Sequence, residues 1–200
     1  MISTAASARQ VRREVRQMRR GLAKREQARR SRIIQRRLAG WLPYLRAQSV
    51  AVFFSADGEP DLAPLIRDAW RSGKAVYLPL LHPFSGSRLW FAPWREKDSL
   101  QLNRFLIPEP VPRYRKPVNA RHLDMVLIPL VAFDSGCARI GMGGGFYDRT
   151  LAYRRHHRCW QRPLLVGVAH EFQRMEEIVI NAWDIPLDAV VTEACIHTCV

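Results

Sequence analysis

Apolar runs alternate along the chain with segments of helical periodicity, and this alternation predicts an α/β fold. The longest run, residues 125–133, is interrupted only by Pro129, so it suits a strand that is buried on both faces. Shorter apolar runs predict further strands at residues 49–55, 75–81, 88–94, 164–169 and 189–192.

Helical patterns occupy the N-terminal segment and two later stretches. Residues 7–41 are rich in Arg, Gln, Ala and Leu and contain no proline, which favours helix, and Gly21 divides them into two. The first helix carries one apolar stripe at spacings of i, i+4, i+7 and i+11, formed by Val11, Val15, Met18 and Leu22. The second carries Ile33, Ile34 and Leu38. A further amphipathic helix at 62–71 is stopped by Gly73, and another is expected at 147–155.

The order strand, helix, strand over residues 49–81 predicts a βαβ unit with parallel pairing. Most of the prolines lie between residues 79 and 117, which indicates ordered loop wrapping the open end of a sheet. We therefore expect a single α/β domain over residues 1–200. It should have a mainly parallel sheet, helices on both faces in a Rossmann-like three-layer arrangement, and a basic N-terminal helix.

A glycine-rich loop follows the longest apolar run. Residues 139–148 read RIGMGGGFYD, with four glycines within five residues and a predicted helix directly after them. Loss of Cβ atoms permits positive φ, including at Gly144, and lets backbone N–H groups converge on an anion. Since the loop lies between a buried strand and a helix start, it predicts a phosphate site; a flexible loop is the alternative. It is not a Walker A loop, because no Lys-Ser or Lys-Thr pair follows, and its spacing departs from the dinucleotide fingerprint.

Asp148 comes directly after this loop. A carboxylate there suits Mg²⁺, which usually takes one or two carboxylates together with substrate phosphates. The other interpretation is a first-turn acid that stabilises the helix N-terminus, and both roles can hold together.

The positive charge of the chain is concentrated near its N-terminus. The whole chain carries +14, of which residues 1–46, with fourteen Lys and Arg against Glu14 and Glu26, account for +12. Arginines 12, 16, 19 and 20 line the flanks of the first apolar stripe. They predict a solvated basic face, a grip on polyphosphate, or a nucleic-acid contact.

The four cysteines (Cys137, Cys159, Cys195 and Cys199) have no framework spacing, so free thiols are the better prediction, although Cys195-x-His197-x-Cys199 could bind a metal. No signal-peptide core occurs before residue 40, and no apolar run is long enough to span a membrane. These features predict a cytoplasmic protein with no membrane partner.

Residues 123–151, LDMVLIPLVAFDSGCARIGMGGGFYDRTL, resemble the 5-formyltetrahydrofolate cyclo-ligase family, whose enzymes are also called 5,10-methenyltetrahydrofolate synthetases. Three further blocks match in the family's order: FSADGEPD at 54–61, NRFLIPEP at 103–110 and WDIPLD at 183–188. The likeness covers almost the whole chain and is closest to bacterial members.

The resemblance implies an enzyme that uses ATP to close 5-formyltetrahydrofolate into 5,10-methenyltetrahydrofolate, with release of ADP and phosphate. Phosphoryl transfer to the formyl oxygen makes an iminium phosphate, which N10 of the folate attacks. Such transfer requires charge neutralisation and in-line positioning more than a protein nucleophile. Accordingly, no spacing ties Ser55, Ser135 or Cys137 to a histidine.

The resemblance also implies site residues. The ATP phosphates would be held by Arg139, Ile140, Gly141, Met142, Gly143, Gly144, Gly145, Phe146 and Tyr147, with residues 142–146 also touching the folate. Arg139 and Asp148 would be catalytic, and Asp148 with Asp188 would hold Mg²⁺. Ala56, Glu59, Asp61 and Phe105 are the further folate contacts; an acid there could pair the pterin's aminopyrimidine edge. Either Glu59 or Asp61 could supply that acid, and Phe105 could instead be a core residue.

Two departures from the family concern cations. Relatives carry Lys or Arg within the glycine loop, where this chain has Met142 and Gly144. Relatives also open with Lys-x-x-x-Arg; Arg12 matches the arginine, whereas the lysine position falls on Ala8 beside Arg9. We therefore expect Arg12 with Arg9 to contact ATP.

Two other functions compete with this one. The basic N-terminal helix could bind nucleic acid, and the glycine loop could serve a small-molecule kinase. The body of the chain lacks a repeated basic-aromatic pattern, so no nucleic-acid partner is expected. The expected ligands are 5-formyltetrahydrofolate and Mg-ATP, bound by a monomer.

Overall fold

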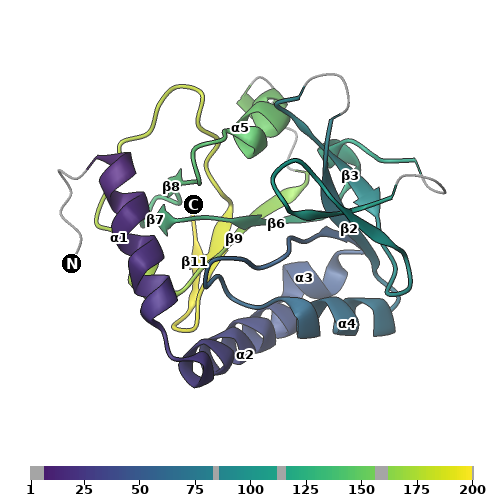
Figure 1. The fold of residues 1–200 in the computed structure, drawn as a ribbon, viewed down its shortest axis with the longest axis horizontal. Helices are drawn as coiled ribbons and strands as arrows, with labels where there is room; N and C mark the ends of the chain where they lie inside the picture. Colours follow the sequence, from purple (N-terminus) through teal and green to yellow (C-terminus); the bar gives the residue numbers. More distant parts are fainter. Residues whose placement is uncertain (1–6, 83–85, 112–115, 156–161, 200) are drawn as a thin grey trace.

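A seven-stranded sheet forms the centre of the part of the chain that the computed structural model describes, residues 7–82, 86–111, 116–155 and 162–199 (Figure 1). In spatial order its strands are β11 (Ile196–Thr198), β10 (Ala189–Val191), β9 (Leu164–Val168), β6 (Met125–Pro129), β1 (Ser49–Ala51), β2 (Ala75–Leu81) and β3 (Leu89–Pro93). From β10 to β2 neighbouring strands pair parallel, and the two edge strands pair antiparallel. The mainly parallel sheet is thus confirmed.

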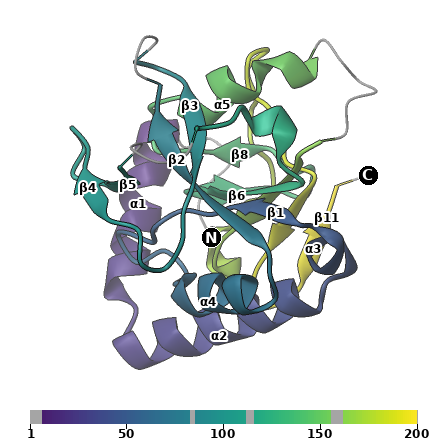
Figure 2. The same cartoon turned by 90° about the vertical axis from the view of Figure 1, so that its right-hand side faces the viewer.

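Helices cover both faces of this sheet. α2 (Lys24–Gly40), α3 (Leu42–Arg46) and α4 (Ala63–Arg71) lie on one side, and α5 (Phe146–Leu151) lies on the other (Figures 1 and 2). Alternate residues of β6 divide between the two cores: Met125 and Leu127 pack toward α2 and α4, whereas Val126 and Ile128 pack with Leu151 of α5. A strand buried on both faces explains the unbroken apolar run.

α1 (Ala8–Gly21) stands across the end of the sheet instead of on a face (Figure 1). Its apolar stripe differs from the predicted one. Val11 and Val15 are fully buried, but Met18 is 41% exposed, and Arg19 takes the next buried position. The stripe therefore runs at i, i+4 and i+8 and ends on a charged residue.

Several boundaries differ from those predicted. The 125–133 run divides: β6 ends at Pro129, and β7 (Ala132–Phe133) pairs with β8 (Arg139–Ile140) in a small separate sheet. β1 is shorter than predicted, α5 continues as the 3₁₀ helix η2 (Ala152–Arg155), and β11 was not predicted. The proline-rich stretch contains a hairpin of β4 (Leu100–Leu102) and β5 (Pro108–Pro110). Two more 3₁₀ helices, η1 (Ala120–His122) and η3 (Glu171–Gln173), complete the described elements.

The cysteine prediction was wrong for one pair. Cys137 and Cys199 form a disulfide, with 5.8 Å between their Cα atoms, which ties the C-terminal strand to the loop between β7 and β8. Cys195 is free and exposed, and Cys159 lies outside the described residues.

Gly167, in the middle of β9, is packed too tightly for a side chain. A Cβ there would lie 2.6 Å from Leu130 Cδ2 and 2.7 Å from Leu187 Cδ1. We expect Gly167→Ala to lower the free energy of unfolding by about 1–3 kcal/mol through overpacking. Gly40→Ala is the control, since no atom lies within 4 Å of its Cβ position. Urea unfolding of both variants measures the difference, and equal stabilities would contradict the packing of β9.

Candidate active site

Three loops meet under α1 at the carboxyl ends of the central strands. The loop after β1 contributes Asp57, whose carboxylate accepts hydrogen bonds from three arginines of α1: Arg16 at 2.6 Å, Arg19 at 3.1 Å, and Arg20. Burial alone would raise the pKa of Asp57, but the hydrogen bonds from Arg16 and Arg20 outweigh it and lower that pKa. All three arginines are therefore paired with one carboxylate, although the side chain of Arg20 remains 63% exposed.

Arg19 is the buried centre of this contact. Its guanidinium is fully buried and also lies 3.4 Å from Glu59 Oε1 and 3.5 Å from the carbonyl oxygen of Leu130, just after β6. Glu59 itself is buried and accepts a hydrogen bond from the Ala56 N–H at 3.1 Å. Burial raises the pKa of Glu59 above its usual value. One arginine thus joins α1 to the loops after two parallel strands.

Tyr147 faces the same interior region from α5. Burial, and then the charge of Glu59, raise the pKa of the Tyr147 phenol, while the charge of Arg139 acts in the opposite direction. Glu59 and Arg139, from distant parts of the sequence, thus both act electrostatically on the Tyr147 phenol.

The glycine loop leaves its N–H groups free. Gly143 has φ 101° and Gly145 has φ 61°, so both adopt the left-handed region as predicted. Gly144 does not, which corrects the expectation for that residue; a Cβ there would instead lie 2.8 Å from the Phe146 ring. Within the described residues, the backbone N–H groups from Met142 to Gly145 have no hydrogen-bond acceptor. They are available to an anion.

Two arginines hold the carbonyl oxygens of this loop. Arg12 Nε of α1 donates to Gly141 O at 2.7 Å, and its guanidinium carbon would lie 3.6 Å from a Cβ on Gly143. Arg149 of α5 donates to Gly144 O and, at 2.9 Å, to Ser87 O. The structure thus brings Arg12 to the loop, whereas Arg9 is exposed one turn earlier on α1.

Arg139 and Asp148 form an ion pair that closes the base of the loop. Arg139 Nη2 lies 2.6 Å from Asp148 Oδ1, and the same oxygen accepts the Ile185 N–H at 3.2 Å. Arg139 also donates to Ile185 O. In the described part of the chain, Asp148 Oδ2 has no hydrogen bond, so one carboxylate oxygen is left for another ligand.

Phe105 is placed against the glycine loop by the β4–β5 hairpin. Its ring meets Phe146 edge to face, with 5.7 Å between centroids, and remains 50% exposed, so it is not a core residue. Glu109 fixes the hairpin, because its Oε1 accepts from the Leu81 N–H at 3.0 Å and from Asn103 Nδ2 at 2.8 Å. Met142 is also 50% exposed.

The remaining predicted residues lie elsewhere or have other contacts. Asp61 Oδ1 accepts the Ala63 N–H at 2.9 Å at the start of α4, and its backbone is bound by Ser31 and Gln35 of α2. Of the two acids, Glu59 is therefore the buried one, paired with Arg19. Ala56 is exposed in the turn that Glu59 closes.

Asp188 has contacts on both carboxylate oxygens. Arg154 donates to them at 2.8 and 2.9 Å, and the Leu165 N–H donates at 2.7 Å. In the structure Asp188 anchors Arg154, and its metal role stays a prediction.

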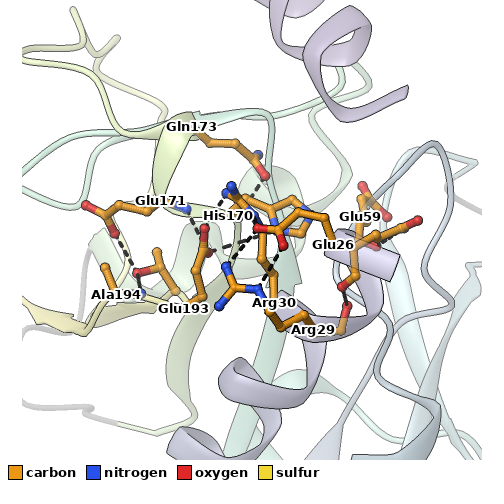
Figure 3. A network of polar contacts seen from close by, with 12 residues as sticks. Glu26, Arg29, Arg30, Glu59, His170, Glu171, Gln173, Glu193 and Ala194 are labelled. Carbon is orange, nitrogen blue, oxygen red and sulfur yellow. Dashed lines mark hydrogen bonds and ion pairs between the residues drawn. The ribbon is translucent and has the colours of Figure 1, made fainter. Parts of the chain in front are cut away.

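Figure 3 shows a polar network, which the sequence did not reveal, between α2 and the segments that follow β9 and β10. Arg30 of α2 bonds Glu26 at 2.7 Å and Glu193 at 2.5 Å, and Glu193 accepts the Glu171 N–H at 2.9 Å. His170, which directly precedes Glu171, is fully buried, and its Nε2 lies 3.1 Å from Gly58 O. Nothing in the sequence distinguishes these buried polar residues from exposed ones. The one available signal concerned Arg19, whose i+4 spacing from Val15 continues the buried stripe of α1.

The chain is similar to known proteins over most of its length. The model of the 5-formyltetrahydrofolate cyclo-ligase family matches residues 4–193. The 5-formyltetrahydrofolate cyclo-ligase of Escherichia coli strain K12 is 45% identical over 89% of this chain and 96% of the relative. That of Haemophilus influenzae is 36% identical over 89% and 93%.

Solved structures are similar as well. The 5,10-methenyltetrahydrofolate synthetase of Aquifex aeolicus superposes with a TM-score of 0.81 at 31% identity, covering 96% of this chain and 92% of that one. The synthetase of Mycoplasma pneumoniae shares the fold with a TM-score of 0.73 at 20% identity, covering 94% and 99%. None of the helices in the described ranges has the length and apolar character needed to cross a membrane.

We expect Arg19→Met to lower the free energy of unfolding by about 3–5 kcal/mol, because it leaves Asp57 and Glu59 without their buried partner. Arg13→Met, on the exposed side of the same helix, should change it by less than about 0.5 kcal/mol. Denaturant titration followed by circular dichroism compares the two. A loss of under about 1 kcal/mol for Arg19→Met would contradict a buried ion pair as the link between α1 and the sheet.

His170 should make stability depend on pH. Burial lowers its pKa from the usual 6.5, so the folded protein keeps the ring neutral while the unfolded chain takes up a proton below that value. The His170 contribution to stability is therefore fully present above pH 6.5 and is lost as pH falls toward the lowered pKa. His170→Gln should flatten the decline below pH 6.5, whereas the exposed control His122→Gln should leave it unchanged. Parallel curves for wild type and His170→Gln would remove His170 as the cause.

Proposed function

The chain belongs to the 5-formyltetrahydrofolate cyclo-ligase family, and from this premise we propose how its residues carry out the ATP-dependent closure of 5-formyltetrahydrofolate to 5,10-methenyltetrahydrofolate. The formyl oxygen is a poor leaving group until it accepts the γ-phosphoryl group of ATP. N10 then attacks the activated carbon, and phosphate leaves with ADP as the other product. One observation supports the roles that we assign to these residues: the glycine loop, with N–H groups that have no acceptor in the described chain, lies beside Arg12 and the Arg139–Asp148 pair.

The loop holds the phosphates of ATP in this proposal. Arg12 and Arg149 bind the carbonyl oxygens of Gly141 and Gly144, so the N–H groups of the same two peptide units, those of Met142 and Gly145, point away from these arginines. α5 is only six residues long, so its dipole adds little. The cationic charge for the phosphates therefore comes from arginines outside the loop, with Arg9 the next residue on the same helix that could reach them.

Asp148 is the residue that fits Mg²⁺. Its Oδ1 is held by Arg139 and the Ile185 N–H, and its Oδ2 has no hydrogen bond within the described ranges. One carboxylate oxygen with phosphate oxygens is a usual donor set for this ion, which would neutralise charge on the transferring phosphoryl group. Arg139 fixes the direction of the carboxylate. Asp188 could join as a ligand only by giving up contacts with Arg154 or Leu165.

The folate binds between the glycine loop and the loop after β1. Phe105, Phe146 and Met142 offer an apolar surface for a flat ring, and two of them remain half exposed in the free protein. Glu59 is the acid available to the pterin edge, since Asp61 faces α2 and α4. Burial raises the pKa of Glu59, and an arriving aminopyrimidine would supply the hydrogen bonds that a buried carboxylate lacks.

We propose that the protein is a cytoplasmic enzyme and acts as a monomer; its use of ATP supports the cytoplasmic location. The activity is tested by following methenyl-folate absorbance and free phosphate with purified protein, 5-formyltetrahydrofolate and Mg-ATP. A phosphorylated product that accumulates without free phosphate would indicate a kinase instead.

Asp148→Asn should lower turnover by about 10²–10³, because it removes about 3–4 kcal/mol of transition-state charge stabilisation while keeping the size of the side chain. Asp184→Asn is the matched control, since that carboxylate bonds only Asn181 in a surface loop of the described chain. Turnover is measured at saturating ATP over a range of Mg²⁺ concentrations. Wild-type turnover at high Mg²⁺ would exclude Asp148 from the metal site.

Arg12→Gln keeps a donor for Gly141 O but removes the charge, so it separates ATP binding from loop shape. We expect it to raise the KM for ATP by about 10- to 100-fold, the usual effect of losing a charge-assisted hydrogen bond of about 1.5–3 kcal/mol. Arg36→Gln, exposed on α2, should change it little. Similar increases in both variants would mean that general positive charge, and not Arg12, attracts the nucleotide. If the chain instead binds nucleic acid, that binding should weaken steeply with salt, and both variants should weaken it equally; this result would support the nucleic-acid-binding function.

A further inference from the structure

A second group of ligand-type side chains lies at the far edge of the sheet, on the hairpin of β10 and β11. Cys195 ends the turn between the two strands, and His197 is the middle residue of β11. Glu171 reaches them from η3. His197 Nε2 lies 2.9 Å from Glu171 Oε2 and 3.3 Å from Cys195 Sγ, and the three donor atoms all lie within 4.8 Å of one another.

This geometry suits one small ion. A tetrahedral zinc ion with bonds of about 2.0–2.3 Å holds its ligand atoms about 3.3–3.6 Å apart, close to the spacing of these donors without metal. Thiolate, imidazole and carboxylate are the three protein ligand types that zinc uses. A sulfur ligand disfavours Mg²⁺, which prefers oxygen, so this group differs in chemistry from the Asp148 site.

The ligands are held in place by their surroundings. Thr192 Oγ1 donates to Glu171 Oε2 at 2.5 Å and accepts the Cys195 N–H at 3.3 Å, so one hydroxyl links two of the ligands. The His197 ring lies 5.2 Å from the Phe133 ring, and its side chain is only 11% exposed. Figure 3 shows the Glu171 carboxylate directed at the turn beside Ala194. Such partners orient ligands before a metal arrives.

We propose that Glu171, Cys195 and His197 form a three-ligand site for Zn²⁺ or a similar borderline divalent cation. Cys195 is exposed, so water can complete the coordination from the solvent side. The third ligand is not Cys199, which is bonded to Cys137. Cys195 and His197 lie just beyond residues 4–193, the range that the family model matches.

The test uses the full chain after removal of metal with a chelator. Zinc binding is measured by competition with a chromophoric chelator, and Co²⁺ is used as a probe because a thiolate ligand gives a charge-transfer band in the near ultraviolet. We expect one zinc per chain and a sulfur-to-cobalt band. Cys195→Ser, His197→Gln and Glu171→Gln should each weaken zinc binding about tenfold or more, and Cys195→Ser should abolish the band.

Two controls separate this site from other thiols and histidines. Cys199→Ser and His122→Gln should bind zinc like the wild type. Cys195 is exposed, so its replacement leaves the core unchanged, and melting curves without metal check the fold of each variant. Zinc binding that survives in Cys195→Ser, or that is lost in Cys199→Ser instead, would overturn the proposal. So would a cobalt spectrum without a sulfur band, since the Glu171–His197 contact would then be an ordinary ion pair.

Discussion

The arrangement of the molecule depends on a buried ion pair between one helix and one turn. Arg19 has no exposed side-chain surface and lies beside Asp57, Glu59 and the carbonyl oxygen of Leu130. Charges taken out of water are tolerated only when their partners are close, so the pair allows few positions of α1 over the sheet. Gly58 makes the approach possible: its φ is 77°, and a Cβ there would lie 2.8 Å from Arg19 O. The glycine and the arginine therefore form a single constraint.

This constraint divides the basic charge of α1 into two kinds. Arg16, Arg19 and Arg20 are bound to Asp57 and hold the helix, whereas Arg12, about one turn N-terminal to Arg16, reaches the glycine loop. The net charge of the N-terminal segment thus overstates what it can offer an anion. A nucleic-acid contact would need these arginines free of carboxylates, and the ion pairs count against it. Position along one helix, and not total charge, separates structural from ligand-facing arginines.

The sequence was informative where a local pattern determines the structure. The glycine loop, the βαβ unit and the strand buried on both faces follow from spacing and composition, and the structure has all three. Residues whose role depends on a distant partner were misjudged. Arg19 seemed to flank a stripe that it in fact completes, and Cys137 meets Cys199 across a separation of 62 residues. The choice between Glu59 and Asp61 needed the positions of two helices: α2 binds the backbone of Asp61, whereas Glu59 is buried beside Arg19 of α1.

The glycine loop has no cation of its own between Gly141 and Gly145, and its charged partners come from outside it. In the proposed function the loop binds phosphate, and its N–H groups are useful only if its carbonyl oxygens point elsewhere. Arg12 and Arg149 bind two of those oxygens from opposite sides, one from α1 and one from α5. In the proposed mechanism each arginine therefore orients the backbone and supplies charge beside it. Because α1 is fixed by the contacts of Arg19 with Asp57 and Glu59, the position of Arg12 over the loop, and in the proposed mechanism the affinity for ATP, depends on a buried ion pair away from the phosphates.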